Sequence, residues 1–150
     1  MSDTEEVRIV AELYYKEPLA ALEWLSDVFG LSTRIFVHDA QDNFVFAETG
    51  WGDNTVAVLP EQSELNRSPV FVDGVNTQTV RVRSSIDVAE HCENARAAGA
   101  HIIREPEQFF FGDLTYFVAD LEGHIWTFAQ PIPGKTGPPP EGWKVSFPSE

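Results

Sequence analysis

The sequence is poor in several residue types, and each shortage excludes a class of protein. A single cysteine, Cys92, among 150 residues excludes an intrachain disulfide, so we expect a reducing compartment. Only 10 Lys and Arg stand against 24 Asp and Glu, and the net charge of −14 would repel nucleic acid. No apolar run approaches the roughly 20 residues of a membrane helix, and residues 1–6 are too polar and acidic for a secretory signal. We therefore expect a cytoplasmic protein with no nucleic-acid or membrane partner.

Hydrophobic residues make up 43% of the chain, including 11 Phe and 4 Trp, which is enough for a globular core. Two segments show helical periodicity. The first accepts Pro18 in its first turn, repeats apolar residues every three or four positions, and ends at Gly30. The second begins at Asp87, with Glu90 as its capping partner, and ends at Gly99. Its predicted buried face consists of Val88, Cys92, Ala95 and Gly99.

Short segments rich in β-branched and aromatic residues surround these helices and predict strands. They are residues 8–15, 33–38, 43–48, 55–59, 79–83, 101–104, 114–119 and 124–129. The turns predicted between them include residues 50–54 and Gly112-Asp113. Both halves therefore have the order strand, helix, three strands. Matching residues recur about 70 positions apart, as Gly30 and Gly99 do, and Pro60 and Pro131. Each half alone would expose one face of its sheet, so we expect the two modules to pack or pair.

We expect one domain over residues 1–130, with modules at about 8–60 and 78–130. The last segment, residues 131–150, holds six of the ten prolines and has no periodicity, which predicts an extended tail. Its apolar side chains could dock on a surface, including that of a second subunit. They are Trp143, Val145 and Phe147.

Three segments carry a resemblance to a known family. The run from Phe111 to Gln130 resembles the closing hairpin of the glyoxalase/bleomycin-resistance/dioxygenase superfamily, also called vicinal-oxygen-chelate proteins, although Leu121 replaces the usual Pro and Leu114 a frequent Arg. The helix-ending segments at residues 21–31 and 95–101 resemble the family's other signatures. The resemblance implies an α+β fold in which two βαβββ modules form paired, curved mixed sheets around a cup-shaped pocket. It also implies a homodimer.

Metal-dependent members of this superfamily place a His or Glu on the first and last strands of each module. The matching positions here hold Val10, Ala57, Val80 or Arg81, and Thr127. These side chains do not supply a competent set of N, O or S donors. The resemblance therefore implies a chain that has lost the family's metal site, and we expect no metal and no cofactor.

Strand alternation predicts which side chains line the cup. Glu12 could pair with a cationic ligand or act as a general base, or it could form a salt bridge with Arg81 or Arg83. Tyr14 and Tyr116 could stack on a planar ligand or serve only as packing residues. No catalytic residue is predicted. The expected ligand-binding residues are Glu12, Tyr14, Trp51, Arg81, Phe110, Tyr116 and Thr127.

These features favour a metal-free protein that binds a small cationic or aromatic molecule, as bleomycin-resistance proteins sequester a drug without changing it. Two alternatives stay open. The first is a metal-dependent lyase, isomerase or dioxygenase of the same superfamily, with ligands from Glu12, Glu48 and His38. The second is a structural or regulatory dimer that binds no small molecule. The partners we expect are a small molecule and a second copy of the chain.

Overall fold

The computed structural model describes residues 7–148, so the acidic segment 1–6 and residues 149–150 lie outside it. The described chain divides into two compact units. The first runs to Asn76 and also includes Leu121–His124, whereas the second comprises Thr77–Asp120 and the described residues from Ile125 onward. None of the helices within residues 7–148 has the length and apolar character needed to cross a lipid bilayer.

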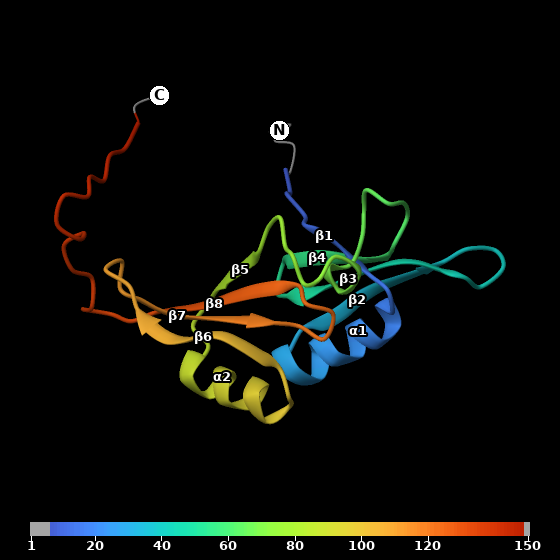
Figure 1. The fold of residues 1–150 in the computed structure, drawn as a ribbon, viewed down its shortest axis with the longest axis horizontal. Helices are drawn as coiled ribbons and strands as arrows, with labels where there is room; N and C mark the ends of the chain where they lie inside the picture. The colour runs from blue at the N-terminus through green and yellow to red at the C-terminus, as the bar shows by residue number, and fades with distance from the viewer. Residues whose placement is uncertain (1–6, 149–150) are drawn as a thin grey trace, which may run out of the picture. The chain divides into compact units, whose positions relative to one another are not determined.

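The first unit is a four-stranded mixed sheet with one helical segment packed on it (Figure 1). The strand order is β1-β4-β3-β2, with β1 parallel to β4 and the other pairs antiparallel. The strands are β1 (Glu12–Tyr15), β2 (Ser32–His38), β3 (Phe44–Trp51) and β4 (Asn54–Pro60). Helix α1 (Pro18–Trp24) continues as the π-helical turn η1 (Leu25–Phe29), and a 3-10 turn, η2 (Pro69–Phe71), follows the sheet.

The second unit repeats this arrangement. Its sheet has the order β5-β8-β7-β6, with β5 parallel to β8 and the other pairs antiparallel. Its elements are β5 (Val80–Arg83), α2 (Val88–Ala97), β6 (His101–Gln108), β7 (Asp113–Ala119) and β8 (Ile125–Pro131). The predicted pair of βαβββ modules is confirmed.

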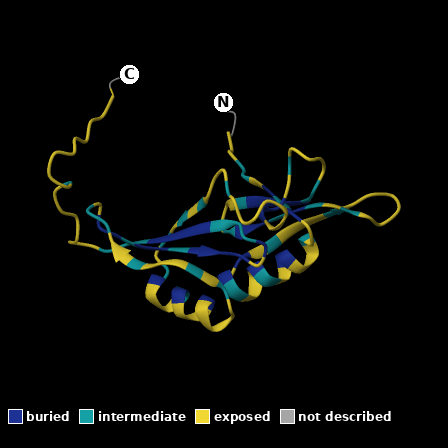
Figure 2. Cartoon of the chain, viewed as in Figure 1, coloured by how far each residue is buried: buried dark blue, intermediate teal, exposed yellow. Residues whose placement is uncertain are grey.

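The predicted helix ends are confirmed together with their physical causes. The backbone N–H of Glu90 donates to the Asp87 carboxylate at 3.0 Å, which caps α2. Gly30 ends η1 in the left-handed conformation, with a φ of 84°. Both helices bury one side and expose the other (Figure 2). The buried positions of α2 are Val88, Cys92 and Ala95.

Three strand ends differ from the predicted ones by three residues or more, and one of them is that of β6, which continues to Gln108 rather than ending at residue 104. β1 begins at Glu12 rather than at residue 8, and the segment before it offers β4 the carbonyl oxygen of Ala11 as an acceptor. β3 extends past residue 48 because Gly50 continues the ladder in very close contact with β4. A Cβ added at Gly50 would lie 1.9 Å from the carbonyl oxygen of Asn54. The glycine that suggested a turn is therefore a point of close strand contact.

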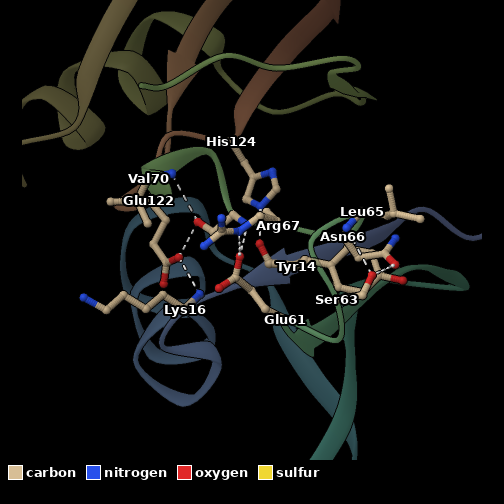
Figure 3. Close-up of polar contacts among 11 residues, drawn as sticks. Tyr14, Lys16, Glu61, Ser63, Leu65, Asn66, Arg67, Val70, Glu122 and His124 are labelled. Atoms are coloured by element: carbon tan, nitrogen blue, oxygen red, sulfur yellow. Dashed lines mark hydrogen bonds and ion pairs between the residues drawn. The ribbon is translucent and has the colours of Figure 1, made fainter. Parts of the chain in front are cut away.

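The connection between β7 and β8 belongs to the first unit, where Glu122 attaches it (Figure 3). The Glu122 side chain is buried and accepts the backbone N–H groups of Lys16 at 2.7 Å and Glu17 at 2.8 Å. It also accepts the hydroxyl of Ser68 at 2.5 Å. One carboxylate thus joins the β7–β8 connection to the start of α1 and to the segment before η2.

Candidate functional site

Register and burial distinguish the two faces of the first sheet. Phe36 of β2 and Leu22 of α1 line one pocket of about 360 Å³, so the Phe36 side chain lies on the helix side. Across the strands Phe36 pairs with Ala47, Ala47 with Val58, and Val58 with Leu13, which places these side chains on the same face. Leu13 is 3% exposed. The alternate residues therefore point away from α1.

We call this opposite surface the first-sheet face, and it combines aromatic groups with carboxylates. Glu12 of β1 and Glu48 of β3 both pair with Ala57 of β4, from opposite sides. Their Cα atoms are therefore two strand spacings apart, about 10 Å. Tyr14 is two positions from Glu12 on β1, and Phe46 is two positions from Glu48 on β3. Their side chains therefore lie on the same face as the two carboxylates. The first-sheet face includes Glu12, Tyr14, Ile35, Val37, Phe46, Glu48, Ala57 and Leu59.

In the second unit, contacts with α2 identify the helix side of the sheet. The His91 ring on α2 lies 2.5 Å from the Tyr116 hydroxyl and 4.2 Å, between centroids, from the Phe128 ring. Tyr116 and Phe128 pair across the sheet, so their strand neighbours point away from α2. We call that surface the second-sheet face. It includes Arg81, Arg83, Arg104, Glu107, Asp113, Thr115, Phe117 and Thr127.

Three charged residues form a cluster on the second-sheet face. Arg83 binds the Asp113 carboxylate through two nitrogens, with Nε at 2.8 Å and a terminal nitrogen at 3.1 Å. Arg81 reaches the same carboxylate at 3.1 Å. The Asp113 side chain is 4% exposed, whereas those of Arg81 and Arg83 are 56% and 57% exposed. The hydrogen bonds from Arg83 hold the pKa of Asp113 below its usual value, because they stabilise the ionised form.

Thr115 lies beside this cluster with an unused polar group. It follows Asp113 by two positions on β7, so both side chains share the second-sheet face. Thr115 is 3% exposed, and among the described residues its hydroxyl oxygen has no hydrogen-bond partner. Ala129 pairs with both Thr115 and Arg83, which puts all three in one row across the sheet. Glu107 of β6 continues the row beyond Thr115, and Arg104 binds its carboxylate at 3.0 Å.

Four of the seven predicted ligand-binding residues lie on these two faces. Glu12 and Tyr14 are on the first-sheet face, and Glu12 is exposed. Arg81 and Thr127 pair with each other on the second-sheet face. The ion-pair partner of both Arg81 and Arg83 is Asp113 of the same unit.

The other three predicted residues lie elsewhere. Tyr116 is fully buried under α2, where burial raises its pKa, so it packs in the core of the second unit. Trp51 ends β3 on the α1 side, where its indole nitrogen is 3.8 Å from a Cβ built on Gly30. Phe110 sits in the β6–β7 hairpin, with its ring 6.1 Å from that of Trp143 in the tail.

The residues at the family's metal positions do not fit a metal ion. The side chains at these positions offer one hydroxyl and no other competent donor; they are Val10, Ala57, Val80 or Arg81, and Thr127. The alternative set is not assembled either, because His38 contacts the rings of Phe36 and Phe44 at the far end of β2. Among residues 7–148, no three His, Cys, Asp or Glu side chains are grouped as a metal site would require.

Arg83, Asp113 and Thr115 were not predicted as site residues. The pair Gly112-Asp113 is typical of a turn, which assigns the Asp113 carboxylate no role, but the turn ends at Gly112 and β7 begins at Asp113. The available signal was the alternation Val-Arg-Val-Arg in β5, which places two arginines on one face. The Thr115 hydroxyl leaves no signal in the sequence, because its lack of a partner depends on packing.

Comparisons with known proteins give a family and several structural neighbours. The model of the Glyoxalase/Bleomycin resistance protein/Dioxygenase superfamily matches residues 8–128. A comparison with curated proteins found no match. TioX from Micromonospora sp. ML1 is 29% identical, with a TM-score of 0.63, over 85% of this chain and 100% of TioX.

Two more distant structures share the fold. TnmS3, an antibiotic-binding protein from Streptomyces sp. CB03234, is 11% identical over 85% of this chain and 99% of its own, with a TM-score of 0.64. The fosfomycin resistance protein FosX from Listeria monocytogenes is 10% identical over 88% of this chain and 98% of its own, with a TM-score of 0.62. Because the family model spans most of the chain and both sheets have the expected topology, this protein belongs to the glyoxalase/bleomycin resistance protein/dioxygenase superfamily.

Proposed function

We propose that this protein binds a small cationic aromatic molecule on its first-sheet face and does not change it chemically. The observation that carries the proposal is the pairing of Glu12 and Glu48 with the same small residue, Ala57. The two carboxylates flank a surface on which Tyr14 and Phe46 can stack against a planar ring. The fold is compatible with this role, since TnmS3 has it and binds an antibiotic.

Binding through side chains rather than through a metal is part of this proposal. The residues at the family's ligand positions, Val10, Ala57 and Thr127, have no competent donor set. Carboxylates and aromatic rings are instead the groups that bind an organic cation directly. Sequestration of a drug-like compound needs affinity and no reacting group, which agrees with this composition.

Titration calorimetry with berberine, a planar aromatic cation, tests the proposal. Glu12→Gln should weaken binding about tenfold, because it removes one charge from the first-sheet face while keeping its shape. Glu64→Gln, at an exposed position in the connection before η2, is the charge-matched control and should leave the affinity unchanged. Equal loss in both variants would show that only the net charge matters, and no binding of cationic aromatics by the wild type would end the proposal.

A metal-dependent enzyme is the second candidate, because Glu12 and Glu48 share one face, although a metal there would need a donor other than His38. Thermal melts with added Ni²⁺, Mn²⁺, Zn²⁺ or Fe²⁺ and elemental analysis of the purified protein distinguish it from the first. One metal per chain, together with a higher melting temperature that Glu12→Gln abolishes, would replace the binding proposal by this one. Unchanged melting temperatures with all four metals would remove the candidate.

We further propose that the protein acts in the cytoplasm as a homodimer. The dimer is suggested by family resemblance, and the compartment by the single cysteine, Cys92. Light scattering at two protein concentrations measures the molecular mass in solution. A mass of one chain at micromolar concentration would contradict the dimer.

A further inference from the structure

The second-sheet face carries a positive charge in a strongly acidic protein. Arg81 and Arg83 share the single carboxylate of Asp113, so the cluster has two positive charges against one negative charge. Each guanidinium has five N–H donors, and three hydrogen bonds in total reach Asp113. Both arginine side chains are more than half exposed. Most of their donors are therefore directed to solvent, where a ligand can reach them.

Asp113 orients these donors without neutralising them. Its two oxygens hold Arg83 in a two-point contact and Arg81 in a one-point contact, which limits the positions that the two guanidinium groups can adopt. Two arginines at alternate positions of one strand would otherwise repel each other. The buried carboxylate relieves that repulsion and keeps both groups on one side of the sheet. Such an arrangement is preorganised for an acceptor with two oxygens.

The Thr115 hydroxyl is a second, independent sign of a ligand site. A buried hydroxyl without a partner is uncommon in a folded protein, because it has lost its hydrogen bonds to water. Thr115 occupies the same row as Arg83, separated from it by Ala129. An oxygen atom bound beside Arg83 in that row would lie on the side of the sheet where the Thr115 hydroxyl has no partner among the described residues, and would accept its hydrogen.

We propose that Arg81, Arg83 and Thr115 form a binding site for an oxyanion group, such as a carboxylate or phenolate, of a small organic molecule. This proposal specifies an acidic group as the part of a ligand that binds here. It rests on the small-molecule binding function proposed above. Arg81 and Arg83 contribute charge-assisted hydrogen bonds, Thr115 donates one neutral hydrogen bond, and Asp113 positions the arginines. Phe117, on the same face, lies under the Arg104 guanidinium, which is 5.2 Å from the centre of its ring, so a third arginine borders the site.

Calorimetry with a matched pair of probes tests this site. The first probe is 1-hydroxy-2-naphthoic acid, and the second is its methyl ester, which keeps the rings but lacks the carboxylate. The acid should bind the wild type at least about tenfold more tightly than the ester, because the loss of charge-assisted hydrogen bonds has that effect. Arg81→Gln should weaken acid binding about tenfold or more and leave ester binding unchanged, whereas Lys144→Gln in the exposed tail, which removes the same charge, should change neither.

Thr115→Val separates a binding role from a structural role. It removes a hydroxyl that has no partner among the described residues, so the melting temperature should stay the same or rise, while affinity for the acid falls severalfold. Equal affinity for acid and ester, or full acid binding by Arg81→Gln, would overturn the oxyanion site. If berberine still binds in that case, the binding function proposed above survives without it. Failure of all three probes to bind would end both.

Discussion

Replacement of Glu122 tests whether one buried carboxylate secures the β7–β8 connection to the first unit. In the wild type, one of its oxygens accepts from the backbone N–H of Lys16 and from the Ser68 hydroxyl, and the other accepts from the N–H of Glu17. Glutamine has the same shape but a single acceptor oxygen. The better orientation of the substituted amide keeps two of these bonds and turns its NH₂ group toward the N–H of Glu17. One donor then faces another in a site that is 8% exposed.

The magnitude follows from the bonds that are lost. Glu122→Gln removes one charge-assisted hydrogen bond and leaves a buried N–H unpaired, which should lower the free energy of unfolding by about 2–3 kcal/mol. Glu122→Ala leaves two backbone N–H groups and one hydroxyl without this acceptor, and should cost about 3–5 kcal/mol. For a chain of this size, the glutamine variant should therefore melt about 4–12 °C below the wild type.

Urea unfolding and amide hydrogen exchange measure this effect globally and locally. The urea midpoint should fall with little change in the m-value, and exchange should speed up at the amides of Lys16 and Glu17, which donate to Glu122. Glu64→Gln removes the same charge at an exposed position and serves as the control. A midpoint for Glu122→Gln equal to that of the control, with unchanged exchange at both amides, would refute the reasoning.

Three further predictions concern the second unit, the cysteine and the β3–β4 hairpin. Arg83 lowers the pKa of Asp113, so their ion pair should stabilise the fold above about pH 4 and be lost on further acidification. As the pH is lowered, the urea midpoint should therefore fall more steeply in the wild type than in Asp113→Asn. Cys92 is fully buried and burial raises its pKa, so a thiol reagent at neutral pH should modify it slowly until urea unfolds the protein; rapid modification of the folded protein would contradict this. Gly50→Ala should prevent correct pairing of β3 with β4, because the new Cβ would lie 1.9 Å from a backbone oxygen, whereas Gly137→Ala, in open space, should leave the circular dichroism melt unchanged.

The modules could be predicted from the sequence because their signals are local. Pro18 and Gly30 bound the first helical segment, and Asp87 caps α2, through contacts between residues close in the chain. Turn boundaries were harder to predict, since a glycine can mark either a turn or a point where two strands approach closely. Gly50 suggested a turn, but its lack of a side chain allows two strands to approach closely.

The candidate site was only partly predictable because it depends on contacts between distant parts of the chain. Alternation placed Glu12 and Tyr14 together, which needs only the period of a strand. The partner of Arg81 was sought in Glu12, but it is Asp113, 32 positions away in sequence, because β8 lies between β5 and β7 in the sheet. Long side chains reach across that intervening strand, and no local pattern records this.

Net charge is a poor guide to the chemistry of a ligand for this protein, because charges are distributed by strand register. The total of −14 suggested a cationic ligand, and the first-sheet face, with Glu12 and Glu48, has that sign. The second-sheet face has the opposite sign, since Arg81, Arg83 and Arg104 exceed Asp113 and Glu107 by one charge. Salt screens charges beyond about 8 Å under physiological conditions, so groups within hydrogen-bonding distance decide what binds. An acidic probe should therefore bind an acidic protein here, with an affinity set by two arginines rather than by the overall charge.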